Sequence, residues 1–305
     1  MTIANKRIPY WDNLKALLIF LVVLGHTGTA MGDKWLSVIY AFHMPLFVFV
    51  SGYFSRRKNS LWETIGKLVI IYLVFHLFYL VFDLLTGQTL SISRILTPSF
   101  SLWYILSLIF WRMIIYFAPQ RVLDKTWLVL CATIGLSLFA GYVQLGTILS
   151  FQRTFVFLPF FIAGYNAHRV GLTVSGNRPL WHNVLALIIL LGLSLLNYFK
   201  LPVFYANQPY LPGNGLCMRA IQLLIAIIIS WSVLNLIPSR KCLLTEIGEI
   251  SLLIFLLHPP IIKGLKVLMT KEGIAAGPVS ALIITILTMS LIFLVRNLRI
   301  LRVLR

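Results

Sequence analysis

The sequence predicts an all-α, polytopic integral membrane protein with about ten transmembrane helices. Of its 305 residues, 59% are hydrophobic and 11% are charged, and the mean hydropathy is +0.92, whereas about a quarter of the residues of a soluble domain are charged. The apolar residues gather in segments close to the length of about 20 residues that a spanning helix needs. The segments cover residues 12–31, 36–54, 63–86, 101–117, 127–143, 153–168, 181–199, 216–237, 250–269 and 279–296. We therefore expect a single transmembrane domain over residues 1–305.

Basic residues between these segments predict the topology. The formal net charge is +18, and the cationic side chains fall in alternate connections, as the positive-inside rule requires. One set of connections holds Lys6, Arg7, Arg56, Arg57, Lys58, Arg121, Lys125, Arg169, Arg178, Arg240, Lys241, Arg296, Arg299, Arg302 and Arg305, and the other holds Lys34, Arg94, Lys200 and Lys271. We therefore expect both termini in the cytoplasm and the protein in the inner (cytoplasmic) membrane. Membrane lipid rather than nucleic acid is the expected partner of these charges, and the oligomeric state stays open.

The first segment carries three ionisable side chains at informative spacings. Lys15 and His26 are separated by ten residues, which on a helix corresponds to ~20° of rotation and ~16 Å of rise, so they share one face. Asp12 falls within ~40° of His26 on that face, and we expect it to pair with Lys15. Ionisable groups on a membrane helix are costly and usually turn away from lipid, which makes them functional candidates.

A second histidine, His43, lies in the next segment. A short loop joins the two helices, so they should be neighbours, with His26 ~8 Å and His43 ~10 Å below their external ends. Pro45 lacks a backbone donor and should kink or loosen the helix beside His43. A lone membrane histidine is as often a helix–helix hydrogen-bonding residue as a catalyst. Two imidazoles at matched depth favour proton transfer, because histidine takes and returns a proton near neutral pH.

The later segments place other polar side chains near the same external level. They are Trp103 and Tyr104 in the fourth segment, Arg153 in the sixth and Arg219 in the eighth. One explanation of these positions is that the aromatic residues lie at the membrane interface and the arginines snorkel toward water. The other is an outward-facing pocket in which aromatic rings stack on a sugar and arginine binds hydroxyls or an anion. His258, which precedes Pro259 and Pro260 in the ninth segment, is a further candidate for this pocket, and His76 in the third is another.

Cations also gather at the cytoplasmic ends of the first two segments. Lys15 should lie close to Arg56, Arg57 and Lys58. Topology and lipid contact account for most such charges, but a phosphate-rich ligand could also bind here. The pantetheine arm of coenzyme A is long and thin enough to cover the ~16 Å from Lys15 to His26.

Several motifs resemble the acyltransferase-3 superfamily of integral-membrane O-acyltransferases. Residues 10–26 resemble the first helix of that family, whose hallmark is an arginine, ten residues and a histidine; here Lys15 replaces the arginine. Residues 42–53, which begin Phe-His-Met-Pro and end Ser-Gly-Tyr, resemble the second helix. Residues 102–106, 160–165 and 250–258 resemble middle and late segments. The short chain without a soluble domain is most similar to the fucose-4-O-acetylase-like branch.

The resemblance implies acyl transfer, usually of acetyl from acetyl-CoA, to a hydroxyl of a cell-surface or lipid-linked carbohydrate such as an exopolysaccharide of the cell envelope. His26 corresponds to the catalytic histidine and is the expected general base, while His43 would orient or share the proton, or donate to the oxyanion. Lys15, Arg56 and Arg57 would bind the donor phosphates, although lysine lacks the bidentate fork of arginine. The expected substrate-binding residues are Asp12, Ser51, Trp103, Tyr104, Arg153, Arg219 and His258. The three cysteines are scattered without metal-ligand spacing, so no metal is expected.

Two other classes of function fit the same polar cavity. An exporter or flippase for polysaccharide or lipid-linked sugar would change only the location of the glycan, whereas an enzyme would change it by one acyl unit. A lipid- or sterol-sensing protein would have no turnover and would not be protected by acetyl-CoA against labelling or proteolysis. Within the enzymatic alternative, the sequence allows direct transfer or a covalent acyl-histidine intermediate.

Overall fold

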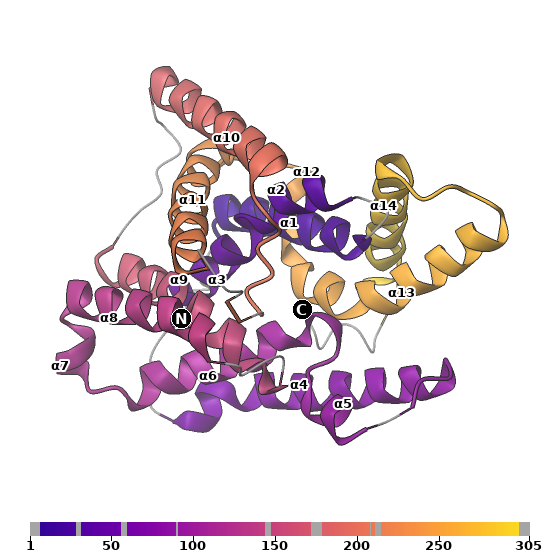
Figure 1. Cartoon of the computed structure of the whole chain (residues 1–305), viewed down its shortest axis with the longest axis horizontal. Helices are drawn as coiled ribbons and strands as arrows, with labels where there is room; N and C mark the ends of the chain where they lie inside the picture. The colour runs from indigo at the N-terminus through magenta and orange to yellow at the C-terminus, as the bar shows by residue number, and fades with distance from the viewer. Residues whose placement is uncertain are drawn as a thin grey trace, which may run out of the picture. The chain divides into compact units, whose positions relative to one another are not determined.

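The structure, a computed structural model, describes residues 7–28, 32–55, 60–89, 91–143, 148–171, 179–207, 209–210 and 215–298. Within these residues every regular element is a helix and none is a strand (Figure 1). The predicted all-α class is therefore confirmed, and each of the ten predicted apolar segments overlaps a helix in the described residues.

The chain forms two compact units that interleave in sequence. Unit 1 comprises the described residues of Met1–Phe47, Thr173–Phe204 and Leu224–Arg305, and unit 2 those of Val48–Leu172 and Tyr205–Leu223. Two helices, α3 (His43–Tyr53) and α11 (Gly215–Leu236), each begin in one unit and end in the other. The single domain expected over residues 1–305 stays a prediction.

The remaining helices each belong to one unit. Unit 1 contains α1 (Pro9–His26), α2 (Asp33–Tyr40), α10 (Leu180–Lys200), α12 (Leu243–Glu249), α13 (Ser251–Lys271) and α14 (Pro278–Val295). Unit 2 contains α4 (Leu61–Leu85), α5 (Ile92–Leu96), α6 (Trp103–Phe117), α7 (Gln120–Leu123), α8 (Thr126–Phe139) and α9 (Phe151–Arg169), with short 3-10 turns at Phe100–Leu102, Ala140–Tyr142 and Ile148–Ser150.

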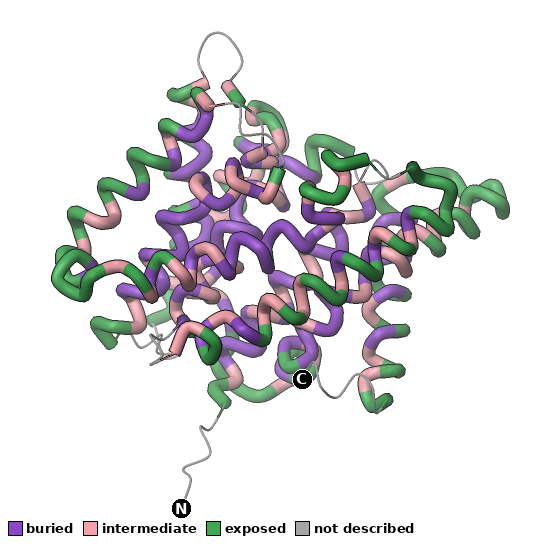
Figure 2. Tube along the Cα trace, turned by 90° about the horizontal axis from the view of Figure 1, so that it is seen from below, coloured by how far each residue is buried: buried purple, intermediate pink, exposed green. Residues whose placement is uncertain are grey.

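Apolar residues cover the outward faces of several helices. Figure 2 shows almost wholly buried helices beside others that expose residues along much of their length. On α4 and α10, for example, Leu77 and Leu195 are 63% and 59% exposed. Exposing this much apolar surface to water is unfavourable by about 25 cal/mol per Å², whereas lipid accommodates it. The protein is therefore a multi-pass membrane protein.

Eight helical segments in the described part of the chain are long and apolar enough to cross a membrane. They are Asp33–Tyr53, Leu61–Leu85, Phe100–Phe117, Ile148–Arg169, Leu180–Lys200, Gly215–Leu236, Ser251–Lys271 and Pro278–Val295. The expected count of about ten is not confirmed by this measure. The two other predicted spans are α1, whose polar ends lower its hydropathy, and the shorter apolar helix Thr126–Tyr142.

Helix α1 is buried along most of its length and packs against α12, α13 and α14 in unit 1. Near its start, Asn13 donates to the carbonyl of Arg240 (2.9 Å) and accepts from the hydroxyl of Thr245 (2.7 Å). Gly248 of α12 lies so close to the Asp12 backbone that a Cβ there would overlap it. These contacts fix the polar end of α1 against the connection that leads into α12.

The second predicted span is not one continuous helix. It forms α2 and α3, which are separated by a turn at Ala41 and Phe42, and α3 begins at His43. Pro45 therefore lies in the first turn of a helix, where its missing N–H disrupts no established hydrogen-bond ladder. The helix is interrupted immediately before His43, rather than kinked or loosened at Pro45 within a continuous helix as expected.

In unit 2, two glycines let α3 and α9 approach at backbone distance. A Cβ on Gly52 would overlap the carbonyl of Phe161, and a Cβ on Gly164 would overlap the carbonyl of Phe49. Small residues permit this kind of close helix packing in membranes, where association depends on van der Waals contact. The two motifs at residues 42–53 and 160–165 therefore meet in the fold.

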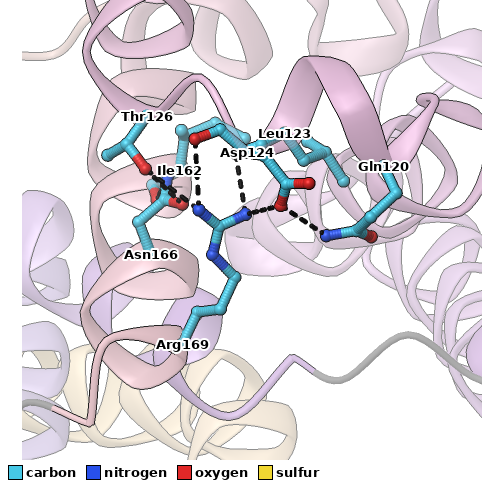
Figure 3. Close-up of polar contacts among 7 residues, drawn as sticks. All are labelled: Gln120, Leu123, Asp124, Thr126, Ile162, Asn166 and Arg169. Atoms are coloured by element: carbon cyan, nitrogen blue, oxygen red, sulfur yellow. Dashed lines mark hydrogen bonds and ion pairs between the residues drawn. The ribbon is translucent and has the colours of Figure 1, made fainter.

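A second contact in unit 2 fixes the end of α9 to the turn between α7 and α8 (Figure 3). Arg169 donates to the carbonyl of Leu123 (2.9 Å), forms an ion pair with Asp124 (2.7 Å) and donates to the hydroxyl of Thr126 (3.2 Å). Arg169, one of the cations that predict topology, therefore also joins the end of α9 to the residues between α7 and α8.

Candidate functional site

His26 is the last residue of α1. The buried hydroxyl of Thr27 donates to the carbonyl of Leu24 (2.6 Å), and Gly28 then adopts a positive φ of 62°, a conformation that glycine takes at little cost. These two residues end the helix directly after the histidine. The expectation that His26 lies ~8 Å inside its helix was therefore wrong, and the half-buried imidazole lies at a helix end.

His258 of α13 lies next to His26. Their ring centroids are 5.0 Å apart, and His258 is fully buried. Its Nδ1 is 3.0 Å from the carbonyl of Ile254. A carbonyl only accepts hydrogen bonds, so the proton of the neutral ring is on Nδ1 and the lone pair is on Nε2. That Nε2 is buried and has no hydrogen-bond partner within the described residues.

His43 repeats this arrangement. Its Nδ1 donates to the carbonyl of Ile39 (2.7 Å), which again leaves the lone pair on Nε2. The ring of Tyr40 is 4.8 Å from the ring of His43, and the same tyrosine packs directly on Gly25, the neighbour of His26.

His26 is close enough to interact electrostatically with both His43 and His258. We call His26, His43 and His258 the histidine cluster. All three lie in unit 1, at a helix end or beside prolines.

At the other end of α1, Lys15 forms the predicted ion pair with Asp12, with a separation of 2.6 Å. The Asp12 side chain is 5% exposed and that of Lys15 is 28% exposed, so the carboxylate is buried while the ammonium reaches the surface. Arg240, whose carbonyl accepts from Asn13, lies near this end of α1. Arg56 and Arg57 lie outside the described residues.

The other predicted site residues form contacts within unit 2. Ser51 and Tyr104 share a hydrogen bond between their hydroxyls. The guanidinium of Arg153 lies 4.8 Å from the ring centre of Trp103, which also stacks on Phe157. The partners of these side chains are other residues of the protein, and Trp103 is only 8% exposed.

Arg219 also has an aromatic neighbour, since its guanidinium lies 5.3 Å from the ring centre of Tyr210. Burial raises the pKa of Tyr210, and the positive charge of Arg219 opposes that rise. His76 stacks on Tyr72 and donates to the carbonyl of Ile95 (2.9 Å) in unit 2, so it is not part of the histidine cluster.

Sequence reasoning missed three residues that the structure brings to these sites. Tyr40 contacts both Gly25 and His43. Arg112 of α6 donates to the Thr64 carbonyl and interacts with Tyr104. Lys266 of α13 lies beside Gly28. For Arg112 and Lys266 the signal was present, because both are cations inside predicted spans.

No set of three or more His, Cys, Asp or Glu side chains in the described ranges is arranged to hold a metal ion. The histidine cluster can transfer protons and form hydrogen bonds. His43 and His258 each present an Nε2 lone pair, and each has its Nδ1 proton held by its own helix. Such a group can accept a proton or a hydrogen bond from a neighbour.

The chain is similar to one protein family and to two nodulation proteins. Residues 8–297 match the protein family described as an acyltransferase domain. A nodulation protein NolL of Sinorhizobium fredii is 25% identical over 288 residues, which cover 84% of this chain and 78% of the relative. A nodulation protein NolL of Mesorhizobium japonicum is 22% identical in an alignment of 340 positions that covers 96% of this chain and 88% of the relative. No solved structure matches the chain.

Proposed function

The chain belongs to the acyltransferase-3 family of integral-membrane acyltransferases, and we propose that it transfers an acetyl group from acetyl-CoA to a hydroxyl of a cell-surface or lipid-linked carbohydrate, with His26 as the general base. The family match supports acyl transfer in a membrane. The identity of the donor, the carbohydrate acceptor and the roles of individual residues are our proposals.

The observation that carries the proposal is the contact between His26 and His258. His26 is half-buried at the end of α1, so one side of its ring can meet a substrate. On the other side His258, with its lone pair on Nε2, lies 5.0 Å away between ring centroids. A base needs a nitrogen that can take a proton and a partner that holds its ring in place; we assign the first role to His26 and the second to His258.

The reaction is a direct transfer. A nitrogen of neutral His26 takes the proton of the acceptor hydroxyl while the oxygen attacks the thioester carbonyl. The new C–O bond gives a tetrahedral oxyanion. When this collapses, the C–S bond breaks, and the proton on His26 passes to the departing thiolate. The products are an ester and coenzyme A, and no other reactant is consumed.

The fixed tautomers support different roles for the two neighbouring histidines. In the reacting complex, His26 turns to donate its N–H to the Nε2 lone pair of His258, which has no partner within the described residues, and this orients the other nitrogen of His26 toward the hydroxyl. Neutral His43 also has a lone pair on Nε2, so it can share the proton that His26 takes. It could donate from Nε2 to the oxyanion only after being protonated, so we favour the proton-sharing role over the oxyanion role.

The donor binds at the Lys15 end of α1. Lys15 is ~16 Å of helix rise from His26, a distance that the pantetheine arm can bridge while the ammonium contacts the phosphates. Asp12, whose carboxylate is buried, holds Lys15 in place through their ion pair. Arg56 and Arg57 are proposed to complete this phosphate site. Trp103, Tyr104, Arg153 and Arg219 stay proposed acceptor-binding residues, with Ser51 as the hydrogen-bond partner of Tyr104.

Glycan mass spectrometry on cells tests this function against an exporter. Cells with the intact protein should carry a glycan heavier by an acetyl unit, and cells with a His26→Ala variant should make the same glycan without it. His182→Ala is the matched control, because His182 stacks on Trp181 at the start of α10, outside the histidine cluster. A glycan that changes its location but not its mass would support export and contradict the proposal.

A further inference from the structure

An ammonium group lies beside the turn that follows His26. The Nζ of Lys266 is 3.8 Å from the position that a Cβ on Gly28 would occupy. Gly28 is two residues after His26 and has no side chain, so the ammonium can approach the backbone of this turn. Lys266 is half-buried and lies eight residues after His258 on α13.

No carboxylate side chain of the chain neutralises this charge. The sequence has eight acidic residues, and the structure describes all of them. Five form ion pairs: Asp12 with Lys15, Asp83 with Arg94, Asp124 with Arg169, Glu246 with Arg296, and Glu249 with Arg7. The other three, Asp33, Glu63 and Glu272, form no ion pair with Lys266. A half-buried cation in a membrane helix is costly unless it is paired or used.

The end of α1 does not need Lys266 as a cap. Thr27 already donates to the Leu24 carbonyl through its hydroxyl and through its backbone N–H (3.1 Å). A cation near a helix C-terminus gains a small dipole interaction, which is the ordinary structural role that the experiment must separate from ligand binding.

The position of Lys266 relates it to the acceptor rather than to the donor. The donor phosphates are proposed to bind at Lys15, at the first turns of α1, whereas Lys266 lies beyond the last turn of the same helix. The proposed base, His26, lies between these two cations along α1. A group bound by Lys266 would therefore reach His26 from the side opposite the thioester arm.

We propose that Lys266 binds an anionic group of the acceptor, a carboxylate or a phosphate, so that the preferred acceptor is an acidic sugar or a sugar phosphate. This inference rests on the proposed function. The charge–charge hydrogen bond holds the acidic group beside Gly28 and brings a neighbouring hydroxyl toward His26. Removing one side of such a bond lowers affinity by about tenfold or more.

The experiment measures binding separately from turnover. Full-length protein in nanodiscs of zwitterionic phosphatidylcholine is titrated with four probes: an oligosaccharide ending in glucuronate, its counterpart ending in glucose, a sugar 1-phosphate, and the same sugar without phosphate. Thermal stabilisation gives the affinity for each. Wild-type protein should bind one or both charged probes about tenfold more tightly than their neutral counterparts, and the two pairs distinguish a carboxylate from a phosphate.

Three variants assign this preference to Lys266. Lys266→Gln should lose it, Lys266→Arg should keep it, and Lys271→Gln should keep it because Lys271 is an exposed cation at the end of the same helix. Equal binding of charged and neutral probes by the wild type, or an unchanged preference in Lys266→Gln, would overturn the proposal. So would loss of the preference in phosphatidylglycerol nanodiscs, which would identify lipid headgroups as the ligand.

Transfer assays on the same variants separate this proposal from the proposed function. Lys271→Gln should acetylate charged and neutral acceptors at the wild-type rates, whereas Lys266→Gln should lower the ratio of kcat/KM for the charged acceptor to that for the neutral acceptor by about tenfold. If His26→Ala still binds charged probes more tightly than neutral ones but transfers no acetyl group, both proposals stand. If it transfers normally while the preference persists, only the proposed base is wrong.

Discussion

The two fully buried histidines have their proton positions set by their own helices. His43 and His258 each donate Nδ1–H to the carbonyl four residues earlier. Each is also followed within two residues by a proline, which has no N–H. The sequence showed both His–Pro associations, but it could not show that the lone pairs are left on Nε2, because that follows from contacts with Ile39 and Ile254.

His258 should be tested as a positioning residue. We expect His258→Phe to lower kcat by about 10²-fold, the lower end of the range for general acid–base effects, with KM for acetyl-CoA unchanged. His258→Gln keeps a hydrogen-bond acceptor and should recover part of the rate. Steady-state kinetics on purified protein provide the measurement. An equal decrease of kcat in both variants, or a change in KM with kcat unaltered, would contradict this positioning role.

The Asp12–Lys15 pair combines a structural and a proposed donor-binding role. Lys15→Met leaves the Asp12 carboxylate buried without its cation, so it should lower the free energy of unfolding by about 1–3 kcal/mol. It should also raise KM for acetyl-CoA. Thermal denaturation in detergent and initial-rate kinetics measure the two effects.

A double variant separates these effects. Asp12→Asn combined with Lys15→Met removes the unpaired charge and should recover most of the stability, while KM for acetyl-CoA stays high. If KM returns to the wild-type value together with stability, Lys15 is only a structural partner of Asp12.

At the scale of the elements, the apolar segments were predictable and their ends were not. Residues 27–31 are small or apolar enough to extend the first segment, yet Thr27 and Gly28 end α1 at His26. Ala41 and Phe42 likewise fit a continuous span, but they form the turn before α3. Hydropathy measures composition over a window, whereas a helix end depends on individual capping contacts and φ angles.

The packing of α3 against α9 provides a prediction at this scale. Gly52→Ala should destabilise the protein by about 2 kcal/mol or more, because the new methyl group overlaps the Phe161 carbonyl and a backbone cannot repack like a side chain. Gly164→Ala should do the same. The melting temperature in detergent is the measurement.

Gly135 of α8 is the matched control, since nothing lies within 4 Å of a Cβ placed there. Gly135→Ala should leave the melting temperature unchanged or raise it, because alanine favours a helix over glycine. Similar melting temperatures for the Gly52 and Gly135 variants would contradict the close approach.

At the scale of the whole molecule, the proposed site residues divide between the two units. The histidine cluster and the Asp12–Lys15 pair belong to unit 1, while Trp103, Tyr104 and Arg153 belong to unit 2. The sequence predicted the all-α membrane class and the Asp12–Lys15 pair, because composition and helical spacing determine both. It could not predict the contact between His26 and His258, because these residues are separated by 231 positions of sequence and meet only through the packing of α1 on α13.

The most direct measurement is a single-turnover assay of acetyl transfer from labelled acetyl-CoA to a glycan acceptor, with purified wild-type protein and the His26→Ala variant at matched folded concentration. We predict that the wild type forms acetylated glycan and releases coenzyme A in equal amounts, and that His26→Ala binds acetyl-CoA but slows transfer by about 10²-fold or more. Transfer at the wild-type rate by His26→Ala would contradict the assignment of His26 as the base.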